Sequence, residues 1–161
     1  RQLLALCKAA SVLGSAVFVL LVAMSIVSIV GRKLWSAPVP GDVELLQVCS
    51  AFAASTFFAY CHLNGGDVKV DFFTAHMRAA WVHRLDAGGS LLVGLVGALL
   101  AWRTTVGALG VRAAAETTMI LDLPLWWGQM AMVPGFVLLA LAGFYMVAWH
   151  VGQSRNMEVQ P

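Results

Sequence analysis

The chain has 161 residues, of which 60% are hydrophobic and only 11% are charged. Soluble globular domains carry about 25% charged residues, so this composition excludes a soluble enzyme or a soluble binding domain. The formal net charge of +2, with Lys and Arg scattered along the chain, also excludes a nucleic-acid-binding surface. Long uncharged runs instead predict an all-α integral membrane protein with four transmembrane helices, folded as one membrane domain over residues 1–161.

The first predicted transmembrane helix covers about residues 3–31. Its far end is marked by Arg32, Lys33 and Trp35, a combination of cations and an aromatic ring that is typical of the membrane–water interface. The apolar run is too long for the core of a signal peptide, and no small-residue cleavage site follows it, so we expect a retained helix. The proline-containing segment 36–41 then predicts a turn.

The second predicted helix covers about residues 42–62 and begins with two acidic residues. Asp42 and Glu44 fall in its first turn, where the helix dipole favours carboxylates, and Asp42 is a candidate N-cap. Small residues recur every four positions further along the helix, and they predict a face on which another helix packs closely. This small-residue stripe consists of Ala51, Ser55 and Ala59.

A short amphipathic helix is predicted over about residues 72–86, between the second and third transmembrane helices. Phe73, Met77 and Trp81 recur at helical spacing on its apolar side, so we expect them to anchor the helix in the membrane interface. The glycine pair at 88–89 predicts the turn from this interfacial helix into the membrane.

The third and fourth transmembrane helices are predicted over about residues 87–111 and 124–150. Arg103 falls inside the third, and we expect its long side chain to extend to the nearby interface. Pro124 is predicted to begin the fourth helix, where its missing N–H has no cost. Pro134, followed by a glycine, predicts a kink.

The orientation in the membrane follows from the distribution of Lys and Arg near the helix ends. Six of these residues lie on the side that carries both termini and the second connection, and four lie on the other side. The count predicts that both termini are cytoplasmic. The six are Arg1, Lys8, Lys69, Arg78, Arg84 and Arg155, and the four are Arg32, Lys33, Arg103 and Arg112.

No arrangement of residues that carries out catalysis is recognisable. The sequence has no HExxH motif, no glycine-rich phosphate loop after a strand, and no acidic residue at mid-helix such as a proton-coupled carrier needs. We therefore predict neither an enzyme nor a stand-alone carrier, and neither a cofactor nor a metal site. Cys7, Cys49 and Cys61 form no CxxC motif and are interpreted as small apolar residues.

The histidines leave one alternative open. His62 and His150 fall at the same side of the membrane, at the ends of the second and fourth helices, where two imidazoles on facing helices could ligate haem in the anchor of a respiratory enzyme. The competing interpretation is that each imidazole simply interacts with the negative end of its helix dipole. His76 and His83 are seven residues apart, and we interpret that spacing as chance.

Several short motifs occur in a characteristic order. They are Arg32, the segment Gly-Asp-Val-Glu-Leu at 41–45, Gly-Asp-Val-Lys-Val-Asp at 66–71, Leu-Pro-Leu-Trp at 123–126 and Val-Pro-Gly-Phe at 133–136. Over nearly the whole chain this set resembles the small, Q-type membrane subunit of tripartite ATP-independent periplasmic (TRAP) transporters. The chain departs from the family pattern at Asp67, where the family has a histidine.

The resemblance implies a non-catalytic small subunit in the bacterial inner membrane. Its partners would be a large multi-helix carrier subunit, which it braces, and a periplasmic substrate-binding protein, in a sodium-coupled system for uptake of organic acids. On this basis we expect contacts with the large subunit along the turn before the second helix, the small-residue stripe and the segment after that helix. The candidate contact residues are Arg32, Asp42, Glu44, Ala51, Ser55, Ala59, Asp67 and Asp71.

Overall fold

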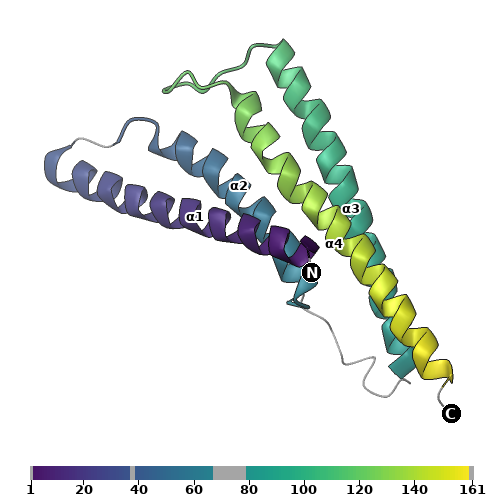
Figure 1. Ribbon diagram of the computed structural model, residues 1–161. Coiled ribbons are helices and arrows are strands. Elements are labelled where there is room, and N and C mark those ends of the chain that lie inside the picture. Colours follow the sequence, from purple (N-terminus) through teal and green to yellow (C-terminus); the bar gives the residue numbers. More distant parts are fainter. Residues whose placement is uncertain (1, 37–38, 67–78, 160–161) are drawn as a thin grey trace.

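The computed structural model describes residues 2–36, 39–66 and 79–159, and these residues form four long α-helices without a strand (Figure 1). All four are long and apolar enough to cross a membrane. The predicted all-α membrane architecture is therefore confirmed. The helices are α1 (Gln2–Trp35), α2 (Asp42–Leu63), α3 (Ala79–Ala113) and α4 (Leu125–Val159).

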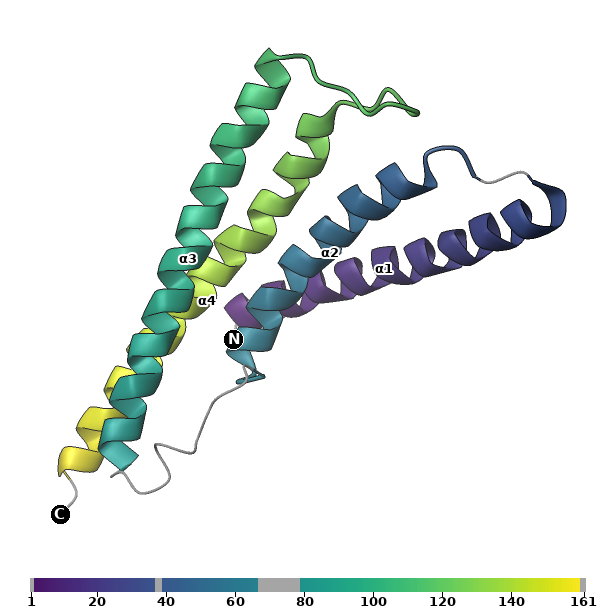
Figure 2. The same ribbon diagram turned by 180° about the vertical axis from the view of Figure 1, so that it is seen from behind.

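The helices form two antiparallel hairpins, α1–α2 and α3–α4, which meet where α2 packs against α4 (Figures 1 and 2). The resulting order across the molecule is α1, α2, α4, α3, so α1 and α3 are the outer helices. The hairpins diverge toward the end that carries the α1–α2 turn and the α3–α4 loop, which we call the loop end. The N-terminus and the C-terminal end of α2 lie at the opposite end.

Each pair of neighbouring helices crosses at a glycine. Gly14 of α1 lies against Thr56 of α2, and a methyl group at Gly135 of α4 would lie 2.7 Å from the carbonyl oxygen of Ser55 in α2. At Gly143 of α4, a methyl group would lie 2.5 Å from the Cα atom of a glycine in α3. Lipid provides no hydrophobic force between helices, so such backbone contact is what lets them associate.

The small-residue stripe of α2 packs inside the chain. Ser55 is 1% exposed and faces Gly135, while Ala59 is 0% exposed and belongs to a buried cluster with Cys7 of α1 and Leu139 of α4. Ala51 is half-buried. The predicted close packing of a helix on this stripe is therefore made by α1 and α4 of the same chain.

The turn predicted at the glycine pair 88–89 is wrong, because α3 runs through both glycines without a break. Residues 79–86, expected at the end of the interfacial helix, belong to α3, and Trp81 is an exposed side chain in its first turns. Two glycines weaken a helix by only about 1 kcal/mol each relative to alanine. A break in the helix would leave backbone N–H and C=O groups without partners, at about 1–3 kcal/mol for each such group that is buried, so the helix continues. Phe73 and Met77 lie outside the described residues.

The fourth helix begins at Leu125, one residue after the predicted start, and continues through Pro134. Pro124 directly precedes it and forms an isolated bridge with Thr117 in the α3–α4 loop. The side chain of Arg103 is exposed on α3, and its reach to the membrane interface stays a prediction.

Replacing Gly143 with leucine should destabilise the α3–α4 hairpin, because the new side chain must push the backbone of α3 away. Overpacking of this kind costs about 1–3 kcal/mol. The melting temperature of the purified protein in detergent measures the effect. Gly88→Leu is the matched control on α3, since nothing lies within 4 Å of a methyl group there. Equal melting temperatures for the two variants would contradict the proposed crossing.

Candidate functional site

Asp42, the first residue of α2, ties α2 back to α1. Its Oδ2 atom accepts hydrogen bonds from the hydroxyl of Ser28 and from Nη2 of Arg32, the latter at 3.2 Å. Its Oδ1 atom accepts the backbone N–H of Val43 at 2.8 Å. Ser28 is fully buried and its oxygen also accepts the N–H of Val39, at 3.3 Å. One carboxylate thus holds both ends of the α1–α2 turn.

The expected N-cap role of Asp42 is not observed. The N-cap position is Gly41, which has φ 71° and makes no side-chain capping bond. This left-handed conformation favours glycine, and a methyl group there would also meet the side chain of Leu121, 2.6 Å from its Cδ1 atom. Asp42 lies one residue too late to cap, and its carboxylate turns to α1 instead.

Glu44 lies on the same first turn and ties α2 to the opposite hairpin. Its Oε1 atom accepts the backbone N–H of Ile120 at 2.9 Å, and its Oε2 atom accepts the N–H of Leu121 at 3.2 Å. Both donors belong to the α3–α4 loop, which extends from the top of α3 toward the start of α2 (Figure 1). We call residues 114–124 the loop strap, and the pair Asp42 and Glu44 the acidic pair.

The loop strap has its own internal hydrogen bonds, which explains why it presents two N–H groups side by side. The N–H of Thr118 donates to the carbonyl of Leu123 at 2.9 Å, and the N–H of Leu123 donates to the hydroxyl of Thr118 at 3.1 Å. Ala115 and Asp122 have φ values of 52° and 51°, so the chain reverses at both ends of the strap. The strap therefore reaches Glu44 as a closed loop.

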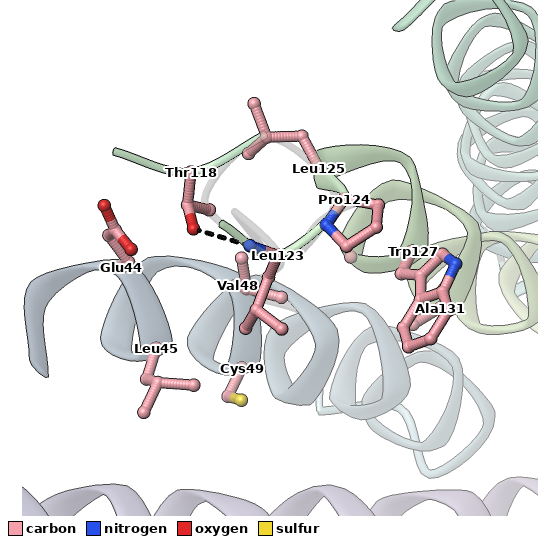
Figure 3. A pocket seen from close by; sticks show the side chains of 11 residues that line it. Glu44, Leu45, Val48, Cys49, Thr118, Leu123, Pro124, Leu125, Trp127 and Ala131 are labelled. Atoms are coloured by element: carbon pink, nitrogen blue, oxygen red, sulfur yellow. Dashed lines mark hydrogen bonds between the residues drawn. The ribbon is translucent and has the colours of Figure 1, made fainter. Parts of the chain in front are cut away.

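A cavity of about 390 Å³ lies beneath the strap, between α2 and the beginning of α4 (Figure 3). Glu44 and Thr118 lie at one edge of it, and Trp127 and Ala131 lie at the other. Most of its lining is apolar. The lining residues are Glu44, Leu45, Val48, Cys49, Thr118, Leu123, Pro124, Leu125, Trp127, Gly128 and Ala131.

The chemistry of this cavity is that of an apolar contact surface. Among the described residues that line it, only Glu44 and Cys49 are ionisable, and both oxygens of Glu44 already accept backbone hydrogen bonds. The cavity therefore offers shape and apolar surface to an occupant.

The residues singled out from the sequence fall into three groups. Arg32, Asp42 and Glu44 gather at the loop end, where Arg32 pairs with Asp42 and its side chain stays 60% exposed. The small-residue stripe lies farther from the loop end along α2 and packs against α1 and α4. Asp67 and Asp71 lie outside the described residues, so their contact with a large subunit stays a prediction.

The histidines do not support the haem alternative. His150 of α4 is buried, and its Nδ1 atom lies 3.3 Å from Nδ1 of His83 on the neighbouring helix α3. His62 is buried in the last turn of α2. His76 is outside the described residues. The imidazole facing His150 is thus His83, and not His62 as a haem site would require.

Sequence reasoning missed the partners of the acidic pair. Ser28 precedes Arg32 by four residues and so lies on the same face of α1, a spacing that could have indicated a shared contact. Nothing in the sequence around Glu44 indicates its hydrogen bonds, because the donors Ile120 and Leu121 are 76 and 77 residues away.

Replacing Glu44 with alanine should release the loop strap. Hydrogen exchange of the Ile120 and Leu121 amides should then accelerate by about tenfold or more, as expected when a hydrogen bond to a charged group is lost. Asp122→Asn is the matched control, because it removes a carboxylate from the strap itself. Unchanged exchange at both amides in Glu44→Ala would show that the carboxylate does not hold the strap.

The chain matches the model of a known protein family. The family described as tripartite ATP-independent periplasmic transporters, DctQ component, matches residues 8–151. The matched segment extends from the first turns of α1 to Val151 of α4 and therefore includes all of α2 and α3. No curated protein matches the chain.

Proposed function

The chain belongs to the DctQ components of tripartite ATP-independent periplasmic transporters, the small membrane subunits of these systems, and we propose that it braces the large carrier subunit. It is a multi-pass membrane protein with four apolar helices. The observation that supports a brace is the double connection between its hairpins, at the Ser55–Gly135 crossing and through Glu44 to the loop strap. A unit joined at two levels resists bending better than one joined at a single point.

The distribution of charge supports a scaffold over a carrier. A substrate path needs polar or charged groups near the membrane midplane. In the described spans, Asp, Glu and Lys lie toward the helix ends, as Lys8 and Asp42 do, while Arg103 falls inside α3 and has an exposed side chain. Transport is therefore proposed to occur in the large subunit.

The substrate class, the driving gradient and the soluble partner are proposed from the resemblance of the sequence motifs to this family. We propose that the complex takes up organic acids such as dicarboxylates, that a sodium gradient drives uptake, and that a periplasmic binding protein delivers the substrate. We place the chain in the bacterial inner membrane with both termini in the cytoplasm and the loop end in the periplasm. The acidic pair and loop strap would then lie on the side where the binding protein docks.

Two of the residues expected to contact the large subunit are buried inside this chain. Ser55 and Ala59 are already covered by helices of this chain. Arg32 and Ala51 keep exposed area, and the outer helix α1 presents a row of exposed apolar residues to its surroundings. We propose that the large subunit packs on such exposed faces, while Ser55 and Ala59 hold the brace together.

Sodium-driven uptake of a labelled dicarboxylate into proteoliposomes tests the proposal. Vesicles should contain the large subunit alone, this chain alone, or both, with the binding protein added outside. We expect uptake with both subunits and none with this chain alone. Gly135→Leu should bring uptake down toward the level of the large subunit alone, because it forces the two hairpins apart.

Gly88→Leu is the matched control and should leave uptake unchanged, since a side chain there meets no neighbour within the chain. Uptake by this chain alone would overturn the brace. Full uptake with Gly135→Leu would show that a joined pair of hairpins is unnecessary for transport.

A further inference from the structure

Three side chains with metal-binding atoms meet at the end of the α3–α4 hairpin opposite the loop strap. His83 and Asp86 come from α3 and His150 comes from α4. Each residue offers one ligand atom, an imidazole nitrogen or a carboxylate oxygen, and these three atoms all lie within 4.8 Å of one another. In the orientation proposed above, this group lies at the cytoplasmic end of the hairpin.

The fold explains why these residues meet. His83 and Asp86 are three residues apart and so share one face of α3. The close approach of α3 and α4 at Gly94 and Gly143 sets the register between the helices. His150 follows Gly143 by seven residues, about two helical turns, and therefore returns to the same seam.

The geometry of the two imidazoles suits a shared cation. Their Nδ1 atoms are 3.3 Å apart while the ring centroids are 5.6 Å apart, so the two nitrogens point toward each other. Zinc–nitrogen bonds of about 2.0–2.1 Å in a tetrahedron place two ligand nitrogens about 3.3–3.4 Å apart. The observed separation matches this spacing.

The chemistry of the ligands suits zinc better than cations that prefer oxygen ligands. Two facing imidazole nitrogens repel through their lone pairs unless a proton or a metal ion lies between them. Two imidazoles and one carboxylate are a known zinc ligand set, with water in the fourth position. Sodium, calcium and magnesium prefer ligand sets made of oxygen atoms.

We propose that His83, Asp86 and His150 bind one Zn²⁺ ion, which joins the beginning of α3 to the end of α4. The bonds formed are two Nδ1–Zn bonds and one carboxylate oxygen–Zn bond, and the proton held between the two Nδ1 atoms leaves for solvent or for Nε2 of its ring. His150 is only 7% exposed and His83 and Asp86 are half-buried, so one side of the site stays open to a water ligand. This proposal is independent of the bracing role.

Zinc titration of the purified chain, carrying no histidine tag, tests the proposal. Isothermal titration calorimetry in detergent should give one Zn²⁺ per chain. His83→Ala should weaken binding by more than about a hundredfold, because loss of an outer partner alone weakens metal sites by about 10–100-fold. His62→Gln, which changes a buried histidine on α2, is the matched control and should bind zinc like the unaltered protein.

X-ray absorption spectroscopy of the zinc-loaded unaltered chain gives a second test that does not depend on a variant folding. We expect two imidazole nitrogens at about 2.0–2.1 Å and one or two oxygens at about 2.0–2.2 Å. Less than one-tenth of an equivalent of zinc bound at saturation, equal affinity in His83→Ala, or a spectrum with sulfur ligands would overturn the proposal.

Discussion

The contact between Ser55 and Gly135 is the constraint on which the arrangement of the four helices depends. A side chain at position 135 would collide with the backbone of α2, so the two helices lie as close as their main chains allow. Lipid supplies no hydrophobic force to join helices, and contact of this kind must do so. The two hairpins are joined chiefly through α2 and α4, since α1 and α3 lie on opposite outer sides.

The acidic pair adds a second connection at the loop end, where the hairpins diverge. Asp42 holds the turn within its own hairpin, and Glu44 reaches across to the loop strap of the other. The apolar cavity lies between this connection and the helix crossing below it. Two connections at different positions along α2 fix the angle between the hairpins, and a fixed angle suits the bracing role proposed for this chain.

The sequence predicts the helices well because a membrane span needs a long uncharged run, and such runs are visible without a structure. It also identifies the small-residue stripe, since close packing in lipid requires small side chains. The prediction of a turn at the glycine pair 88–89 was wrong because the backbone hydrogen bonds of a continuous helix outweigh the low helix propensity of glycine.

The sequence did not predict which groups the side chains of Asp42 and of the histidines would contact. Asp42 at the start of a helix suggests a cap, yet a capping residue must precede the first helical residue, and that position belongs to Gly41. The group of His83, Asp86 and His150 depends on the register of α3 against α4, which the glycines at the crossing determine. Spacing along one helix carries no information about that register.

The central claim is that the two hairpins form one rigid unit, and a distance measured between them tests it most directly. Spin labels at Lys33 at the end of α1 and Arg112 at the end of α3, both exposed, would report that distance by pulsed electron spin resonance in lipid nanodiscs. We expect one narrow distance distribution in the unaltered chain and a broad one in Gly135→Leu. A broad distribution in the unaltered chain, or an equally narrow one in the variant, would contradict the account.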